Sequence, residues 1–205
     1  LTVDDFRGIS ISPVLSKIFE KCILDRYGRF LETSDNQFGF KRGIGCSHAI
    51  YSVKCVVDHF VQQNSTINLC AIDLKKAFDT MNHHGLFLKL MDWMLPVNML
   101  RTFEYWFSIC NTCVRWGDNL SNFIKLKCGV RQGGVLSAYF FAVYIDEIVD
   151  IIRRRNLGCK LGQISVGIFS VCRRHHTAGT ICKCSAANVV YMWRTSAILR
   201  YVFKY

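Results

Sequence analysis

The sequence predicts an α/β (α+β) domain built on one central sheet. Residues 67–74, INLCAIDL, form a continuous apolar run with β-branched side chains that ends in a carboxylate, which is typical of a buried strand. Residues 135–155 follow a glycine-rich segment and have the length and apolar spacing of a long helix. Two further helical patterns, at 12–32 and 47–62, precede the strand.

The first half of the chain places its helix starts at small polar residues. The pattern at 12–32 begins with Ser-Pro, and the pattern at 47–62 is expected to be capped by Ser47. Between them, residues 35–46 are polar and glycine-rich, which predicts a loop or a short hairpin.

The second half predicts two helices, two strands and a loop before the long helix. The helices are 84–95, which Pro96 would stop, and 97–110. Residues 112–127 indicate two strands around a Gly-Asp-Asn turn. The glycine-rich loop 128–134 then opens the long helix.

Length and hydrophobicity are those of a chain with a sizeable core. The chain has 205 residues, of which 51% are hydrophobic, so a disordered polymer is excluded. No apolar run reaches the roughly 18 residues of a spanning helix, so we expect no membrane segment. The first residues, LTVDDFRGIS, have neither the pattern of a signal peptide nor an initiator Met, and we interpret the chain as a fragment of a longer gene product.

The charge is basic and unevenly distributed. The net charge of +11 favours a polyanion partner such as nucleic acid. Residues 1–170 hold 20 Lys and Arg and all 15 Asp and Glu, a net of +5, whereas residues 171–205 hold six Lys and Arg and no acid. The last 35 residues therefore differ in composition from the rest.

The eleven cysteines predict buried thiols in a reducing compartment, because most of them sit inside apolar runs. Cys110 and Cys113 form a C-x-x-C, but no second pair at zinc-site spacing lies nearby. A second possible metal cluster is the run of Cys and His in 172–184.

Three segments carry residues suited to phosphate chemistry, and each has an ordinary alternative. Asp73 stands where sheet proteins place catalytic groups, but Asp is also a frequent helix N-cap. The segment 129–137, GVRQGGVLS, allows a close approach to phosphate at a helix N-terminus, or is a plain loop–helix junction. Lys41 and Arg42 suit a triphosphate, or are a solvated pair of charges.

Four ordered segments are together far more specific: LSKIFEKCI, QFGFKRGIGCSHAI, AIDLKKAFDTMNH and GVRQGGVLSAYFFAVYIDEI. They closely resemble the reverse-transcriptase domain of non-LTR (LINE-type) retrotransposons, over about residues 6–169. The resemblance implies a right-hand polymerase fold with fingers and palm. It also implies an RNA-directed DNA polymerase (a nucleotidyltransferase) that uses Mg²⁺, with RNA template, DNA primer and dNTP as partners and no membrane.

The resemblance also implies roles for individual residues. Asp73 corresponds to a catalytic, metal-binding carboxylate, and Leu74 would offer its backbone carbonyl to the same metals. Phe78 corresponds to the aromatic gate beneath the sugar. The remaining correspondences are Gln132 and Gly133 against the incoming nucleotide and template, Lys41 or Arg42 over the triphosphate, and Arg7 near the start of the fingers as a nucleic-acid contact.

The family's other metal-binding carboxylates, in a Tyr-Ala-Asp-Asp hairpin, are missing after 164–170. SVCRRHHTAGT stands there, and no acid follows Asp150. Residues 171–180 can be encoded by GTA TGC AGA CGA CAT CAT ACT GCT GGC ACC, which from its second nucleotide reads TAT GCA GAC GAC ATC ATA CTG CTG GCA. The shifted reading encodes Tyr-Ala-Asp-Asp-Ile-Ile-Leu-Leu-Ala, so we infer a single-nucleotide frameshift after Ser170.

The predicted organisation is a fingers and palm fragment at 1–170, with an incomplete palm sheet and no thumb, followed by a poorly structured, out-of-frame basic tail at 171–205. The Cys and His cluster in that tail then has no selected geometry for a metal. We expect a catalytically dead reverse transcriptase. The alternatives are a non-catalytic nucleic-acid-binding remnant and an unstable pseudogene product, since Val166–Phe169 would form an exposed apolar edge.

Overall fold

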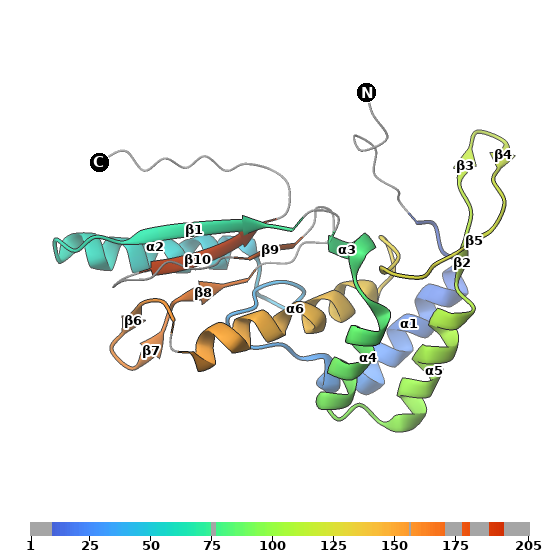
Figure 1. The fold of residues 1–205 in the computed structure, drawn as a ribbon, viewed down its shortest axis with the longest axis horizontal. Coiled ribbons are helices and arrows are strands. Elements are labelled where there is room, and N and C mark those ends of the chain that lie inside the picture. The colour runs from blue at the N-terminus through green and yellow to red at the C-terminus, as the bar shows by residue number, and fades with distance from the viewer. Residues whose placement is uncertain (1–9, 75–76, 156, 171–177, 181–188, 195–205) are drawn as a thin grey trace. The chain divides into compact units, whose positions relative to one another are not determined.

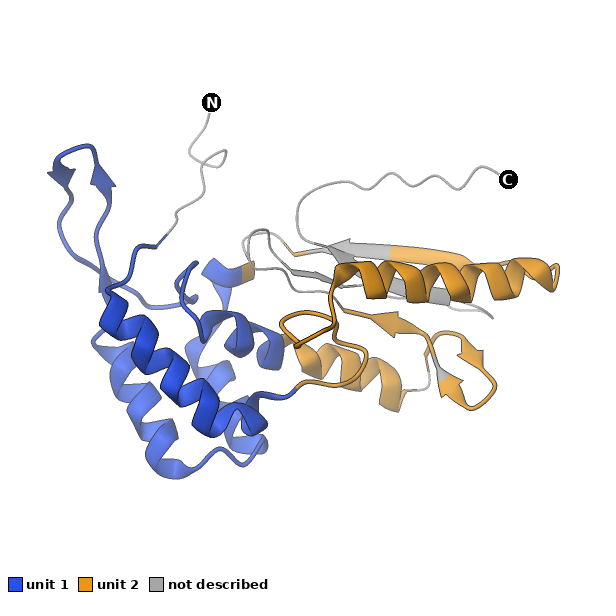
Figure 2. Ribbon diagram, turned by 180° about the vertical axis from the view of Figure 1, so that it is seen from behind, with its two compact units in different colours: residues 1–32, 78–144 blue, residues 33–77, 145–205 orange. Residues whose placement is uncertain are grey.

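A computed structural model describes residues 10–74, 77–155, 157–170, 178–180 and 189–194. The chain divides into two compact units, coloured in Figure 2: unit 1 comprises residues 1–32 and 78–144, and unit 2 comprises residues 33–77 and 145–205. The long helix α6, Ser137–Arg154, contributes its first half to unit 1 and its second half to unit 2.

Unit 1 is mainly helical (Figure 1). Its core is aromatic: Phe103 and Phe140 are buried, and their ring centroids lie 4.9 Å apart in an edge-to-face arrangement. Leu86 and Leu90 are also fully buried, and their spacing of four residues places them on one face of their helix. The helices that build this unit besides α6 are α1 (Val14–Tyr27), η2 (Gly28–Leu31), α3 (Ala77–Thr80), α4 (His83–Asp92) and α5 (Val97–Ser108).

The predicted helices of this unit are present, but the helix expected at 84–95 ends earlier. α4 stops at Asp92, and Met94 adopts a left-handed φ of +57°. The Met94 amide donates to the carbonyl of Met91 at 2.8 Å, which closes the helix before any proline is reached. The expectation that Pro96 stops this helix was therefore wrong, and Pro96 instead precedes α5 as its N-cap.

The strands expected at 112–127 are present as one hairpin with two short pairings. β2 (Asn111–Thr112) pairs with β5 (Ile124–Lys125), and β3 (Arg115–Trp116) pairs with β4 (Asn119–Leu120), all antiparallel. Gly117 takes the left-handed φ of +59° that the turn requires.

Unit 2 is built on a four-stranded sheet in the order β1-β9-β10-β8, with an additional pairing of β1 with β10. β10 runs parallel to both β1 and β8, and β9 is antiparallel to β1 and β10. A small hairpin, β6 with β7, precedes β8. The strands are β1 (Asn68–Asp73), β6 (Lys160–Leu161), β7 (Ile164–Ser165), β8 (Ile168–Phe169), β9 (Ala178–Thr180) and β10 (Val189–Arg194).

The helix α2, Cys46–Gln62, supplies much of the core of unit 2. Its N-cap is Gly45, so the expectation of Ser47 as cap was wrong. The Gly45 carbonyl accepts from the amides of His48 and Ala49, and the Gly45 amide donates to His48 Nδ1 at 3.2 Å. These bonds satisfy the first turn two residues before Ser47 can do so. The buried core of unit 2 comprises Val53, Val56, Val57 and Phe60 of α2, Val149 and Ile152 of α6, Cys159, Ile168 and Phe169.

β1 is not buried on both faces, contrary to the prediction from its apolar run. Ile67 and Cys70 pack against the core that α2 covers, whereas the Leu69 side chain is 46% exposed. Figure 1 shows α2 behind the sheet that contains β1. An apolar run cannot tell a strand covered on two faces from a strand covered on one.

The edge expected to be exposed at Val166–Phe169 is covered, so that prediction was wrong as well. Ile168 and Phe169 are 2% and 4% exposed. β10 pairs with them on one side, and on the other the backbone of Gln37 bridges that of Ser170. The Phe38 amide also donates to the Ser170 carbonyl at 2.7 Å.

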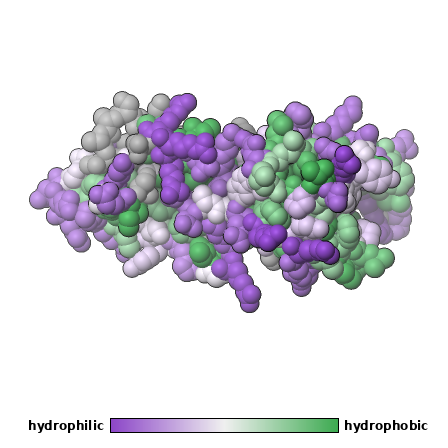
Figure 3. Space-filling model, turned by 90° about the horizontal axis from the view of Figure 1, so that it is seen from below, coloured by the Kyte–Doolittle hydropathy of each residue, from purple (hydrophilic) through white to green (hydrophobic). Residues whose placement is uncertain are grey.

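The surface retains many apolar side chains. Figure 3 shows one face on which apolar residues (green) stand among polar ones (purple), most densely toward the right of the view. On α1 the apolar residues Val14, Leu15 and Ile18 are 71%, 78% and 54% exposed. Among the described residues, no helix is long and apolar enough to cross a membrane.

Candidate active-site residues

Asp73 is the last residue of β1, at the carboxyl end of the strand as predicted. In the register of the sheet its backbone stands opposite Gly179 of β9, a residue without a side chain. Leu74 follows the strand, and its side chain packs against the core of unit 2. Asp73 and Leu74 therefore lie at the carboxyl end of the strand. The residue paired with Asp73 on the neighbouring strand carries no carboxylate.

Lys41 and Arg42 lie in the loop between η2 and α2, also in unit 2. The Lys41 ammonium donates to the Ser34 carbonyl at 2.5 Å, so in this structure it is used to hold the loop. Arg42 is exposed and makes no ion pair with the described residues. The loop is bent by a left-handed φ at Phe40 and at Gly43.

The loop is held by Asp146 of α6, which sequence reasoning did not single out. Its carboxylate oxygens accept from the backbone amide and the hydroxyl of Ser34, both at 2.8 Å, and the residue is 3% exposed. Burial raises the pKa of Asp146 above its ordinary value, while the hydrogen bonds from Ser34 and the charge of Lys41 oppose that rise.

In unit 1, the glycine-rich loop docks on the segment that follows β1. The Gly129 amide donates to the Met81 carbonyl at 2.7 Å, and the Val130 amide donates to the Phe78 carbonyl at 2.8 Å. Gly129 has a φ of +77°, and a Cβ there would lie 2.6 Å from the Asp79 carbonyl oxygen. Only glycine permits this approach between the two backbones.

Gln132 and Gly133 lie at the tip of this loop. The Gln132 amide nitrogen donates to Asp79 Oδ1 at 3.0 Å, and the Gln132 carbonyl accepts from the Ser10 amide at 2.9 Å. Gly133 has a φ of +119° and is exposed. The structure thus joins the Gln-Gly loop to Asp79, a residue that follows directly after Phe78.

Phe78 is part of the core of unit 1. Its ring is 8% exposed and stacks on Phe141, with centroids 4.7 Å apart and planes at 25°. The carbonyl of Phe78 itself accepts the hydrogen bond from the Val130 amide, so the stacked ring and the docked loop belong to the same residue contact. The role of Phe78 against a sugar stays a prediction.

The N-terminus of α6 is occupied by a carboxylate of the protein itself. Glu20 Oε2 accepts from the Leu136 amide at 3.0 Å, directly before the first residue of the helix. Glu20 is 2% exposed. The phosphate site suggested by a helix N-terminus after a glycine-rich loop is therefore taken by an internal anion.

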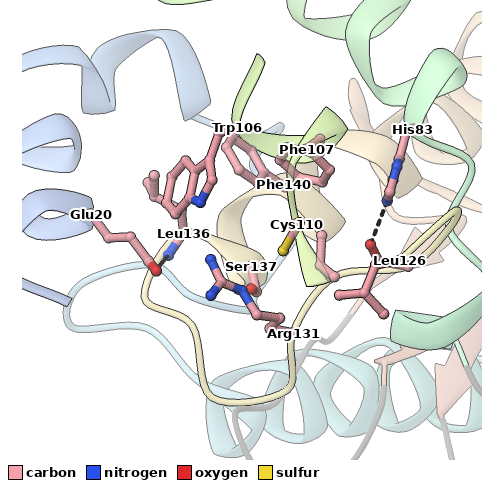
Figure 4. Close-up of a pocket in the computed structure, with 12 residues that line it drawn as sticks. Glu20, His83, Trp106, Phe107, Cys110, Leu126, Arg131, Leu136, Ser137 and Phe140 are labelled. Atoms are coloured by element: carbon pink, nitrogen blue, oxygen red, sulfur yellow. Dashed lines mark hydrogen bonds between the residues drawn. The ribbon is translucent and has the colours of Figure 1, made fainter. Parts of the chain in front are cut away.

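A pocket lies beside this loop within unit 1 (Figure 4). Aromatic rings of Trp106, Phe107 and Phe140 form part of its wall, and the Arg131 guanidinium lies 5.4 Å from the centre of the Trp106 ring. His83 Nε2 contacts the Gly129 carbonyl oxygen at 2.7 Å on the far side of the pocket.

Arg7 and the Cys and His cluster at 172–184 lie outside the described residues. Cys110 and Cys113 flank the strand β2, and an extended backbone separates residues three apart by roughly 10 Å, too far for one disulfide or one zinc ion. Among the described side chains, no group of three or more His, Cys, Asp or Glu could hold a metal ion.

Glu20, Asp79, His83 and Asp146 are the polar residues that sequence reasoning missed. Their partners lie far away in the chain, 116 residues from Glu20 and 112 from Asp146. The local sequence carries no signal for Glu20, because it stands among Lys17, Lys21 and Asp25 in a segment whose apolar residues recur at helical spacing.

Comparison with known proteins gives a consistent assignment. Residues 2–170 match the family described as reverse transcriptase (RNA-dependent DNA polymerase). The chain is 28% identical over 147 residues to the probable RNA-directed DNA polymerase from transposon X-element of Drosophila melanogaster. The aligned region covers 70% of the chain and 16% of the relative.

Two further relatives are also products of mobile elements. The RNA-directed DNA polymerase from mobile element jockey of Drosophila funebris is 26% identical, over 72% of the chain and 16% of the relative. The retrovirus-related Pol polyprotein from type-1 retrotransposable element R2 of Popillia japonica is 24% identical, over 81% of the chain and 24% of the relative. The chain therefore spans between 16% and 24% of the length of these curated relatives.

A mixed helix and sheet chain with these ordered motifs fits a reverse-transcriptase domain. The chain belongs to the reverse transcriptase (RNA-dependent DNA polymerase) family. The resemblance to the domain of non-LTR (LINE-type) retrotransposons is thereby confirmed. The family implies a nucleic-acid template and nucleotide substrates.

Proposed function

We propose that this chain is the fingers and palm portion of a non-LTR retrotransposon reverse transcriptase, and that it does not itself polymerise DNA. The single observation that carries the second part is the absence of any Asp or Glu after Asp150. The register of the sheet supports it, because the residue opposite Asp73 is Gly179.

The proposed chemistry is phosphoryl transfer assisted by divalent ions, Mg²⁺ by analogy with the family. Two such ions, roughly 4 Å apart, need several carboxylate oxygens between them. The residues at the end of β1 do not fit that requirement, since Asp73 is the only acid in the paired strands of the sheet. This end of the strand is therefore proposed to lack the ligands for a pair of divalent ions.

The remaining roles concern binding. Lys41 or Arg42 is proposed to contact the triphosphate. Gln132 and Gly133 are proposed to lie against the incoming nucleotide and template, and Phe78 to limit the space beneath the sugar. Arg7 is proposed as a nucleic-acid contact. The exposure of Gly133 and Arg42 supports this assignment, because both residues are open to solvent among the described residues.

The loss of the carboxylates is proposed to come from a single-nucleotide frameshift after Ser170. Two observations support it. The family match ends at residue 170, and the codons of 171–180 can spell Tyr-Ala-Asp-Asp-Ile-Ile-Leu-Leu-Ala in another frame. The nucleotide sequence across codons 165–180 tests the idea, which fails if the wobble bases spell a different peptide.

A primer-extension assay tests the proposed inactivity. The chain is incubated with an RNA template, an annealed DNA primer, dNTPs and Mg²⁺, and we expect no extended product. The Asp73→Asn variant is the matched control, because it removes the one remaining motif carboxylate. Template-dependent extension by the native chain that this substitution abolishes would overturn the proposal.

A second candidate is a nucleic-acid-binding remnant, favoured by the net charge of +5 that residues 1–170 carry without the tail. Binding through phosphate contacts weakens steeply with salt, by about 0.9 in log K per log salt for each neutralised phosphate of a duplex. A salt titration of affinity for an RNA–DNA duplex measures this slope. A slope near zero contradicts this candidate, and a chain that never folds to a cooperative state supports an unstable product instead.

A further inference from the structure

Helix α1 buries a carboxylate, Glu20, and one apolar residue, Ile23, whereas several of its other apolar residues are exposed, which is unusual for a surface helix. Glu20 is 2% exposed, whereas Leu15 and Ile18 on the same helix are mostly open to solvent. Burying a carboxylate is unfavourable unless it receives hydrogen bonds. The buried Glu20 carboxylate therefore needs a hydrogen-bond donor that offsets its loss of hydration. The identity of that donor indicates the role of Glu20.

That partner is the end of the glycine-rich loop. Glu20 Oε2 accepts from the Leu136 amide at 3.0 Å, and the Ser16 hydroxyl donates weakly to Oε1 at 3.4 Å. Figure 4 shows the Glu20 carboxylate pointing at the Leu136 amide at one side of the pocket. A carboxylate at this place also compensates the positive end of the α6 dipole.

The loop is packed tightly against this carboxylate. A Cβ on Gly134 would lie 3.2 Å from Glu20 Oε2 and 2.5 Å from the Ser137 hydroxyl. The Gly134 amide donates to the Arg131 carbonyl at 3.1 Å, which turns the backbone just after Gln132 and Gly133. A shift of the carboxylate would consequently move the turn that carries those two residues.

The other end of the same loop is fixed independently. Gly129 and Val130 donate their amides to the carbonyls of Met81 and Phe78, and His83 contacts the Gly129 carbonyl oxygen. Gln132 and Gly133 thus occupy the middle of a short span that is held at residue 129 by one segment and at residue 136 by α1.

We propose that Glu20 is a positioning residue that holds the Gln132-Gly133 turn in the conformation that meets nucleotide and template. The inference rests on the proposed function for Gln132, but it concerns a residue of another helix. It acts through the loop backbone and touches no substrate. The acceptor oxygen carries the role, so a neutral side chain of the same shape retains it.

The first test measures amide hydrogen exchange at Leu136 in the full chain. Loss of a buried hydrogen bond to a charged group corresponds to about a ten- to hundredfold change in an equilibrium. We expect Glu20→Ala to speed exchange at Leu136 by that factor, and Glu20→Gln to leave it within about threefold of the native rate.

Three outcomes of this test are decisive. Exchange that is restored in Glu20→Gln supports the positioning role. Equal acceleration in both variants overturns it. Should Glu20→Ala fail to fold, the native chain still decides, because a Leu136 amide that exchanges at the rate of an unstructured peptide overturns the inference.

The second test is a double-mutant cycle on the affinity for a duplex of RNA template and DNA primer, read by fluorescence anisotropy. The variants are Glu20→Ala, Gln132→Ala and the two combined, with Asp92→Ala as an exposed-carboxylate control expected to bind like the native chain. If Glu20 acts through Gln132, the double variant loses no more affinity than Gln132→Ala alone. Additive losses overturn the link.

The two tests separate the inference from the proposed function. An affinity that Gln132→Ala leaves unchanged overturns the role of Gln132 in binding and the functional part of the inference with it. Exchange at Leu136 that depends on the Glu20 acceptor still supports the positioning of the loop in that case.

Discussion

Replacing Gly129 by Ala tests the docking of the glycine-rich loop. Gly129 has a φ of +77°, and a Cβ there would meet the Asp79 and Phe78 carbonyl oxygens at 2.6 and 2.7 Å. Both contacts are with backbone, which cannot rotate away. The new methyl group must therefore push the loop from the segment 78–81 and break the hydrogen bond from the Val130 amide to Phe78.

The expected destabilisation is the sum of two effects. The left-handed backbone costs a non-glycine residue about 1–2 kcal/mol. Inserting a methyl group into a filled space costs about 1–3 kcal/mol more. The variant should lose roughly 2–5 kcal/mol of unfolding free energy, a large share of the roughly 5–15 kcal/mol typical of a native protein.

Two glycines provide matched controls. Gly43 has the same φ of +77° and Gly117 has a φ of +59°, and a Cβ at either position meets nothing within 4 Å. Their Ala variants carry the backbone cost alone, and Gly117 belongs to the same unit as Gly129. Their expected loss is about 1–2 kcal/mol.

Urea unfolding followed by circular dichroism measures the differences. The unfolding free energy falls by about 1–3 kcal/mol per M of urea. The extra steric cost at Gly129 therefore lowers the unfolding midpoint by up to a few M relative to either control. Equal midpoints for the Gly129→Ala and Gly117→Ala variants would refute the close approach of the two backbones.

Three other outcomes follow from buried groups. Burial raises the folded-state pKa of Asp146 above 3.8, so its folded state binds more protons and stability falls as pH rises from about 3.8 through that pKa. The difference in unfolding free energy, Asp146→Asn minus the native chain, should therefore become more positive as the pH rises from 3.5 to 7. A difference that becomes more negative contradicts this prediction. Burial raises the pKa of the Cys159 thiol to about 11, so a disulfide reagent at pH 8 should label exposed Cys22 quickly and Cys159 only on unfolding. Phe103→Ala should cost about 3–5 kcal/mol in a denaturant titration, since the ring is fully buried, and a loss below about 1 kcal/mol would refute that packing.

Helices were predictable because their pattern is local. The segments expected at 47–62 and 97–110 correspond to α2 and α5 within a few residues, since apolar positions recur every turn. Their ends were less predictable. Gly45 caps α2 ahead of Ser47, and Met94 ends α4 ahead of Pro96, because each terminus depends on a few competing backbone hydrogen bonds.

The candidate site likewise has features that the sequence predicted and features that it did not. The glycine-rich loop and the position of Asp73 at the end of a strand were both predicted from short motifs. Glu20 was not, because the apolar spacing of α1 predicts that its apolar face is buried. Leu15 and Ile18 are exposed instead. Glu20 is buried because its carboxylate accepts a hydrogen bond from the Leu136 amide, 116 residues away in the chain.

By itself the sequence determined the family of this protein, through four ordered motifs, and the lack of any acid after Asp150, through composition. Only the tertiary structure decided which polar groups the fold uses for itself. Lys41 binds the Ser34 carbonyl, and Glu20 takes the N-terminus that could have bound phosphate. The physical reason is that a hydrogen bond needs atoms about 3 Å apart and is stronger where water is excluded, and for residues far apart in the chain both conditions come from tertiary packing.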